Sequence, residues 1–118
     1  MAGEIQRFGV NPRLSMAVSH GGSVYLSGQV AIDAAGGPIP EQAREVLRRI
    51  DDLLIEAGTD RSRLLTVTLY VADLATLPEI NAIWLDWLAG AQPPCRTTVE
   101  AKLASPRYAL EISAVAAI

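Results

Sequence analysis

The sequence is poor in the residues that build metal centres and disulfide frameworks. Its 118 residues include one cysteine, Cys95, and one histidine, His20. A lone cysteine excludes an intramolecular disulfide, and no cluster of cysteine or histidine is available for a structural zinc ion. No apolar run approaches the roughly 18 residues that cross a bilayer, and the first residues lack the apolar core of a signal peptide. We therefore expect a cytoplasmic protein with no membrane segment.

Positive charge and aromatic side chains are also scarce. Ten Lys and Arg stand against thirteen Asp and Glu, which gives a formal net charge of −3, and the longest basic run is Arg48-Arg49. The aromatic residues (two Trp, three Tyr and one Phe) are scattered along the chain. Binding of nucleic acid needs clustered basic residues, and single strands also need a platform of aromatic rings. Nucleic acid is therefore not an expected partner.

Apolar residues, in contrast, are abundant. Half of the chain is hydrophobic, while nine Gly and seven Pro are too few for a disordered or low-complexity segment. A chain of this length has room for one hydrophobic core. We expect a single domain over residues 1–118.

Two segments have the apolar spacing of amphipathic helices, residues 41–57 and 77–88. Gly58 follows the first segment and Gly90 the second, as expected at helix ends. The charged residues of the first helix, Glu45 among them, are assigned to its solvent-exposed side. The residues that form the two apolar stripes are Ala43, Val46, Leu47, Ile50, Leu53, Leu54 and Ala57 in the first and Ile80, Ile83, Trp84, Trp87 and Leu88 in the second.

The remaining segments favour strands. Residues 64–71 alternate with a period of two, and residues 23–27, 96–103 and 108–118 have similar character, while 4–8 and 14–18 are candidate edge strands. The order predicts an α+β fold with about six strands and two helices on one face of the sheet. The last strand is apolar on both of its faces, so the uncovered face needs a partner, and we expect a closed homo-oligomer.

Two charged residues, Arg96 and Glu111, stand within predicted strands and are candidates for a binding site. Arg96 opens a predicted strand after Pro93-Pro94, and Glu111 stands between Leu110 and Ile112 in the last one. If strands 96–103 and 108–116 pair directly through residues 104–107, Arg96 and Glu111 fall at corresponding ends, within reach of one small ligand. A structural ion pair or an outward-facing glutamate explains the pattern equally well. His20 and Cys95 fit an exposed turn and a strand start better than they fit a nucleophilic site.

Four segments together resemble a known family: residues 24–30 (Val-Tyr-Leu-Ser-Gly-Gln-Val), 79–84 (Glu-Ile-Asn-Ala-Ile-Trp), 93–100 (Pro-Pro-Cys-Arg-Thr-Thr-Val-Glu) and 110–116 (Leu-Glu-Ile-Ser-Ala-Val-Ala). In this order and spacing they resemble the YjgF/YER057c-like family, the RidA reactive-intermediate deaminases. The resemblance implies a chorismate mutase-like fold assembled as a homotrimer, with a central barrel and a pocket at each of three subunit interfaces.

The resemblance also implies a reaction and a set of site residues. The reaction is hydrolysis of 2-imino acids to 2-keto acids and ammonia, without a metal or cofactor. Arg96 is implied to bind the substrate carboxylate and Glu111 to position or activate water. The cleft is implied to be lined by backbone groups around Ser27 and Gly28 and by the side chains of Asn81 and Thr98, in part from the neighbouring subunit.

Leu14 marks a departure from the family pattern. It stands in Asn-Pro-Arg-Leu-Ser, residues 11–15, where archetypal members have a tyrosine. The lost hydroxyl changes one wall of the implied pocket, so this chain resembles a divergent subgroup. The alternative functions are a non-catalytic sensor that binds a small carboxylate and an endoribonuclease or translation inhibitor, which the acidic composition disfavours.

Overall fold

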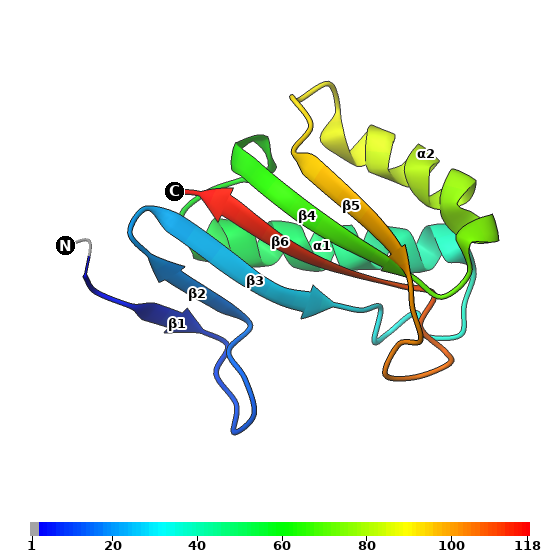
Figure 1. The fold of residues 1–118 in the computed structure, drawn as a ribbon, viewed down its shortest axis with the longest axis horizontal. Helices are drawn as coiled ribbons and strands as arrows, with labels where there is room; N and C mark the ends of the chain where they lie inside the picture. The colour runs from blue at the N-terminus through cyan, green and yellow to red at the C-terminus, as the bar shows by residue number, and fades with distance from the viewer. Residues whose placement is uncertain (1–2) are drawn as a thin grey trace.

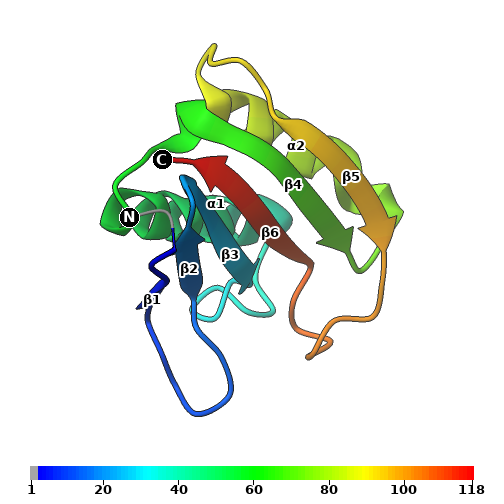
Figure 2. The same ribbon diagram turned by 60° about the vertical axis from the view of Figure 1, so that its left-hand side comes forward.

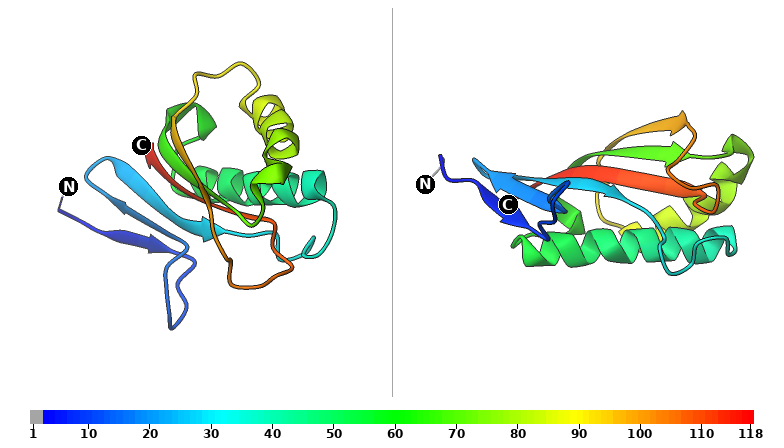
Figure 3. Two further views of the ribbon diagram at one scale, coloured as in Figure 1. Left: turned by 45° about the vertical axis from the view of Figure 1, so that its right-hand side comes forward. Right: turned by 90° about the horizontal axis from the view of Figure 1, so that it is seen from below.

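In the described part of the chain, six strands form one mixed sheet, and two helices cover one of its faces (Figure 1; Figure 3, right). The computed structural model describes residues 3–118. The strands are β1 (Gln6–Phe8), β2 (Ala17–His20), β3 (Ser23–Gln29), β4 (Leu64–Val71), β5 (Cys95–Glu100) and β6 (Leu110–Ala117). The helices are α1 (Ile39–Glu56) and α2 (Leu77–Leu88), and two short 3₁₀ turns, η1 (Arg61–Arg63) and η2 (Leu74–Thr76), flank β4. The predicted α+β fold is confirmed.

Most element boundaries agree with the sequence patterns, but the candidate edge strand over 14–18 is displaced, because β2 spans Ala17–His20. The strand over 64–71 and the helix over 77–88 match β4 and α2 at both ends. Helix α1 begins two residues before the predicted start, because Pro40 occupies its first turn, where no backbone N–H is needed. Strand β5 ends at Glu100, three residues before the predicted end.

The strand order is β1-β2-β3-β6-β4-β5. Strand β4 lies between β5 and β6, so the predicted direct pairing of segments 96–103 and 108–116 is wrong. The cause is the connection through α2, because a helical crossover returns the chain parallel to the strand it left. Strand β5 therefore pairs with β4 in parallel, and β6 pairs antiparallel with the other edge of β4.

The hydrophobic core lies between the sheet and the helices. Strands β4 and β6 send alternate side chains into it, Val67 and Leu69 from one and Ile112 and Ala114 from the other. Helix α1 adds Val46, Leu47, Ile50 and Leu54, and α2 adds Ile80, Ile83, Trp84 and Leu88. Within residues 3–118 neither helix could span a membrane.

The opposite face of the sheet has no helix over it (Figure 2). Tyr25, Val115 and Thr66 pair across this face, and so do Ser113, Thr68 and Thr97. Half of the Tyr25 surface is exposed (50%). The predicted arrangement of two helices on one face is confirmed, and the uncovered face is available to another subunit.

Candidate functional site

Arg96 is a half-buried cation without an anionic partner among residues 3–118. It pairs with Val67 of β4, so its side chain lies on the helix-covered side of the sheet, at the outer edge. The carbon of its guanidinium group lies 5.6 Å from the ring centroid of Trp84 on α2. Within residues 3–118 the guanidinium group takes part in no ion pair. Its N–H groups are therefore free to bind an external anion.

Asn81 and Thr98 lie on the same side as Arg96. Thr98 pairs with Leu69, two residues along β5, and so shares a face with Arg96. Asn81 precedes Trp84 by three residues on α2, which places both on one helix face. The Oδ1 atom of Asn81 is buried and has no hydrogen-bond partner in the described chain. We call Arg96, Thr98, Asn81 and Trp84 the arginine cluster.

Glu111 lies on the other face of the sheet. It pairs with Tyr70 of β4, on the uncovered side, and its carboxylate lies directly over Gly28 of β3. A Cβ atom built on Gly28 would lie only 1.9 Å from Oε2 of Glu111, so glycine is required for this approach. The register of β3 on β6 shifts between Leu26 and Gln29, which leaves Gly28 without a partner on β6. We call Glu111, Gly28 and the adjacent Ser27 the glutamate cluster.

The hydroxyl of Ser27 is engaged inside the chain. It donates to the carbonyl oxygen of Met16 at 3.2 Å and accepts from Nε2 of Gln29 at 3.2 Å. The side chain of Ser27 therefore fixes the end of β3 against the segment that leads into β2. The predicted contribution of Ser27 to a cleft is then limited to its backbone.

Leu14 lies in the loop between β1 and β2, at the opposite edge of the sheet from β5 (Figure 1). Its surface is 43% exposed. Asn11 holds the loop, because its Oδ1 accepts from the backbone N–H groups of Arg13 at 2.8 Å and Leu14 at 3.1 Å. Leu14 is thus an exposed apolar side chain on a constrained loop, remote from Arg96 in the same chain.

The two clusters do not meet within one chain. Arg96 and Glu111 point to opposite faces, have β4 between them, and are level with Val67 and Tyr70 respectively. Two strand spacings of about 4.8 Å and three residues of about 3.3 Å place their Cα atoms about 14 Å apart. The expectation that one chain brings both side chains within reach of one ligand is therefore wrong.

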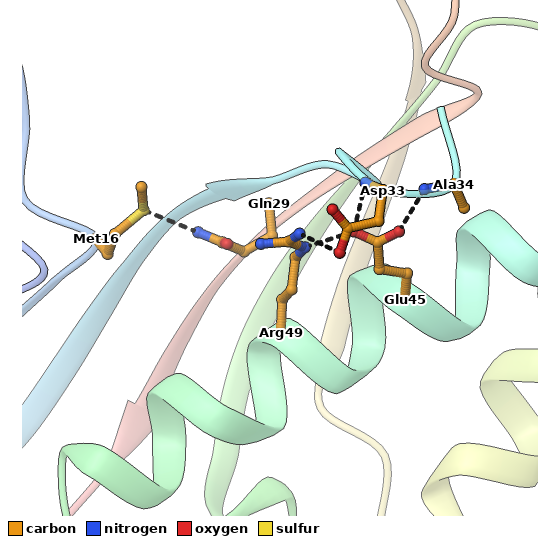
Figure 4. A network of polar contacts seen from close by, with 6 residues as sticks. All are labelled: Met16, Gln29, Asp33, Ala34, Glu45 and Arg49. Carbon is orange, nitrogen blue, oxygen red and sulfur yellow. Dashed lines mark hydrogen bonds and ion pairs between the residues drawn. The ribbon is translucent and has the colours of Figure 1, made fainter. Parts of the chain in front are cut away.

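Glu45 is a buried charge that the helical pattern did not identify. Its side chain is only 4% exposed, not on the solvent side as predicted. Figure 4 shows its carboxylate directed at the backbone of Asp33 and Ala34, with Arg49 beside it. The carboxylate accepts from the backbone N–H groups of Asp33 (3.1 Å) and Ala34 (2.7 Å) and from Nε of Arg49 (2.7 Å). Burial acts to raise the pKa of Glu45, but these hydrogen bonds and the charge of Arg49 lower it below the usual 4.5. The i,i+4 spacing of Glu45 and Arg49 is the only signal of this pair in the sequence.

Glu45 fixes the loop that follows β3. That loop carries the chain from the glutamate cluster to α1, so its anchoring restrains the end of β3.

Within residues 3–118 no three His, Cys, Asp or Glu side chains lie close enough to hold a metal ion. A cavity of about 620 Å³ lies beside residues 100–108, and neither Arg96 nor Glu111 lines it.

Residues 4–118 match the family described as endoribonuclease L-PSP. A RutC family protein of Haemophilus ducreyi is 38% identical over 97% of this chain and 97% of its own length. The RutC family protein YoaB of Escherichia coli is 33% identical over 97% of this chain and 98% of its own length.

Solved structures agree with these sequence matches. A YjgF family member from Neisseria meningitidis superposes with a TM-score of 0.92 at 36% identity, covering 99% of this chain and 97% of that one. A member of the Rid protein family from Yersinia pestis, described as of unknown function, gives a TM-score of 0.87 at 29% identity, covering 92% and 90% of the two chains. The predicted resemblance is confirmed: this chain belongs to the endoribonuclease L-PSP family, which contains the YjgF, RutC and Rid proteins.

Proposed function

We propose that this protein hydrolyses 2-imino acids to 2-keto acids and ammonia in a site shared by two subunits of a homotrimer. The arginine cluster of one subunit and the glutamate cluster of its neighbour form each site. The observation that carries the proposal is the guanidinium group of Arg96, which has no ion-pair partner within residues 3–118 and lies against the ring of Trp84. On the same helix, three residues before Trp84, Asn81 has a buried amide oxygen without a hydrogen-bond partner in those residues.

Arg96 is suited to bind the substrate carboxylate. A guanidinium group offers a planar fork of N–H donors that matches both oxygens of a carboxylate. Its edge-strand position exposes it to a neighbouring subunit. Binding through this group fixes the adjacent C2 atom, which is the electrophilic carbon of a 2-imino acid.

Asn81 supplies a second contact. Its buried Oδ1 atom is a hydrogen-bond acceptor without a donor in the described residues, and the imine N–H of the substrate can be that donor. With the carboxylate on Arg96 and the N–H on Asn81, one face of C2 is left open to water.

Glu111 of the neighbouring subunit is suited to act on that water. Its carboxylate orients the water, accepts a proton as the oxygen bonds to C2, and passes that proton to the imine nitrogen, which gives a carbinolamine. The hydroxyl proton of the carbinolamine then moves to nitrogen as the C–N bond breaks and the C=O bond forms, which releases ammonia and leaves the 2-keto acid. The overall reaction consumes one imine and one water, and it needs no redox partner.

The uncovered face of the sheet favours a shared site. A cyclic trimer places two different surfaces of the same chain in contact, and each contact repeats three times. Such a contact can bring the edge strand β5 of one subunit to the open face of the next, where Glu111 lies. Arg96 of one subunit and Glu111 of the next can then line one pocket, although the two side chains lie on opposite faces of the sheet in each subunit.

Turnover of a freshly generated imine tests the proposal. An amino-acid oxidase produces 2-iminopropanoate from alanine, and release of pyruvate and ammonia is followed with and without this protein. We expect the wild type to accelerate the release of pyruvate and ammonia. In Arg96→Ala we expect kcat/KM to fall at least a hundredfold, which corresponds to a loss of about 2.7 kcal/mol of carboxylate binding. Full activity in Arg96→Ala would refute the proposal. Saturable binding of pyruvate without any turnover would favour the carboxylate sensor instead.

A further inference from the structure

We propose that Trp84 is a positioning residue, which holds the guanidinium group of Arg96 in its carboxylate-binding orientation. The inference rests on the proposed function and assigns a role to a residue outside the implied site. The guanidinium carbon lies 5.6 Å from the Trp84 ring centroid, within the range of a cation–π contact.

An aromatic face is a suitable holder for a binding arginine. A carboxylate partner would orient Arg96 but would occupy its N–H donors and neutralise its charge. The face of an indole attracts the cation and leaves all five N–H groups for the ligand. Because Trp84 is only 7% exposed, its ring is itself fixed by the core.

Contacts behind Trp84 fix its ring in turn. The rings of Trp84 and Trp87 are 5.6 Å apart at an angle of 39°. Nε1 of Trp87 donates to Oδ2 of Asp51 on α1 at 2.8 Å, and Nη2 of Arg61 donates to the same oxygen at 2.8 Å. The guanidinium carbon of Arg61 also lies 4.9 Å from the Trp87 ring centroid. A series of contacts thus runs from Asp51 on α1 through Trp87 and Trp84 to Arg96.

The kinetic signature of this role is a change in KM. Arg96 binds a carboxylate that is present in both substrate and transition state, so loss of its orientation weakens both equally. We expect Trp84→Leu to raise KM about tenfold, equivalent to about 1.4 kcal/mol, and to leave kcat within about twofold. Trp84→Phe keeps an aromatic face and should restore most of the affinity.

Ile83→Ala is the matched control. Ile83 is a buried neighbour on α2, so its truncation creates a cavity and lowers thermal stability as Trp84→Leu does. It lies beside a groove between α1 and α2, away from Arg96. We expect Ile83→Ala to lower the melting temperature with no change in KM. An unchanged KM in folded Trp84→Leu, or an equal rise in Ile83→Ala, would overturn the inference.

Fluorescence supplies a readout that does not depend on turnover. Trp84 and Trp87 are the two tryptophans of the chain, so Trp87→Phe leaves Trp84 as the single reporter. Titration with pyruvate should change the Trp84 emission with saturation, and Arg96→Gln in the same background should abolish the change. The affinity of pyruvate, measured by calorimetry, should fall about tenfold in Trp84→Leu.

The two measurements separate the inference from the proposed function. Turnover by the wild type with normal pyruvate binding in Trp84→Leu would overturn the inference alone. Absence of turnover with pyruvate binding that depends on both Arg96 and Trp84 would overturn the proposed function alone. Absence of any saturable pyruvate binding to the wild type would overturn both.

Discussion

Mixed trimers of two inactive variants test whether the active site is shared between subunits. In the proposed mechanism, Arg96→Gln removes the carboxylate anchor and Glu111→Gln removes the group that acts on water. The two residues point to opposite faces of the sheet and have β4 between them. If each site takes Arg96 from one subunit and Glu111 from the next, a trimer that contains both variants can hold an intact site.

The recovered activity follows from counting the interfaces. In a cyclic trimer each interface has a direction, so a site is intact when its first subunit carries Arg96 and its second carries Glu111. With equal amounts of the variants and random assembly, each condition holds for half of the subunits. About one quarter of the sites are then intact, and with substrate well below KM we expect about 25% of the wild-type kcat/KM.

The assay is deamination of 2-iminopropanoate by co-refolded protein. Each variant refolded alone, and the two mixed after folding, serve as inactive controls. Wild type co-refolded with the double variant Arg96→Gln/Glu111→Gln distinguishes the arrangements further. A shared site leaves about a quarter of the sites intact in that mixture, whereas a site within one subunit leaves about half. No recovery in the first mixture and half activity in the second would refute the shared site.

Three further substitutions probe the clusters and their support. Gly28→Ala should lower kcat at least tenfold, because the added Cβ atom displaces the Glu111 carboxylate. The free energy of unfolding should change by no more than about 1 kcal/mol, because Gly28 does not adopt a positive φ. An unchanged kcat would contradict the contact. Leu14→Tyr should raise kcat/KM for 2-iminopropanoate relative to larger imines, and an unaltered ratio would place the loop outside the pocket. Glu45→Gln should lower the free energy of unfolding by about 1–3 kcal/mol at neutral pH. Folding lowers the pKa of Glu45, so the difference in free energy of unfolding between wild type and variant should be complete above pH 4.5 and should disappear as the pH falls through the pKa of the folded state. Denaturant titrations at several pH values measure this difference. A difference that persists in acid would refute the assignment.

The helices and the strand over 64–71 could be predicted because their signals are local. A spacing of three and four places apolar side chains on one side of a helix, and a spacing of two does so in a strand. Gly58 and Gly90 end the segments before tertiary contacts matter, and both adopt positive φ. These features depend on neighbours in the sequence, so the sequence alone carries them.

The strand order could not be predicted in the same way. Alternation states which residues of a strand share a face, but not which strand lies beside it. The short predicted connection 104–107 favoured direct pairing of the two strands, whereas the crossover through α2 placed β5 on the far side of β4. Glu45 failed for a related reason, because the backbone N–H groups that hold it belong to a loop distant in the sequence.

The separation of the two charged residues bears on assembly as well as on catalysis. Arg96 lies at the edge of the sheet and the Glu111 carboxylate lies on its open face, so the two surfaces that carry them are different and opposite in charge. A contact between subunits that brings these two surfaces together places the cation of one subunit near the anion of the next. A twofold dimer can make this contact twice, and a head-to-tail ring repeats it at every interface. The two charges therefore favour contact between the edge and the open face, and a measured molecular mass decides between the two forms of closure.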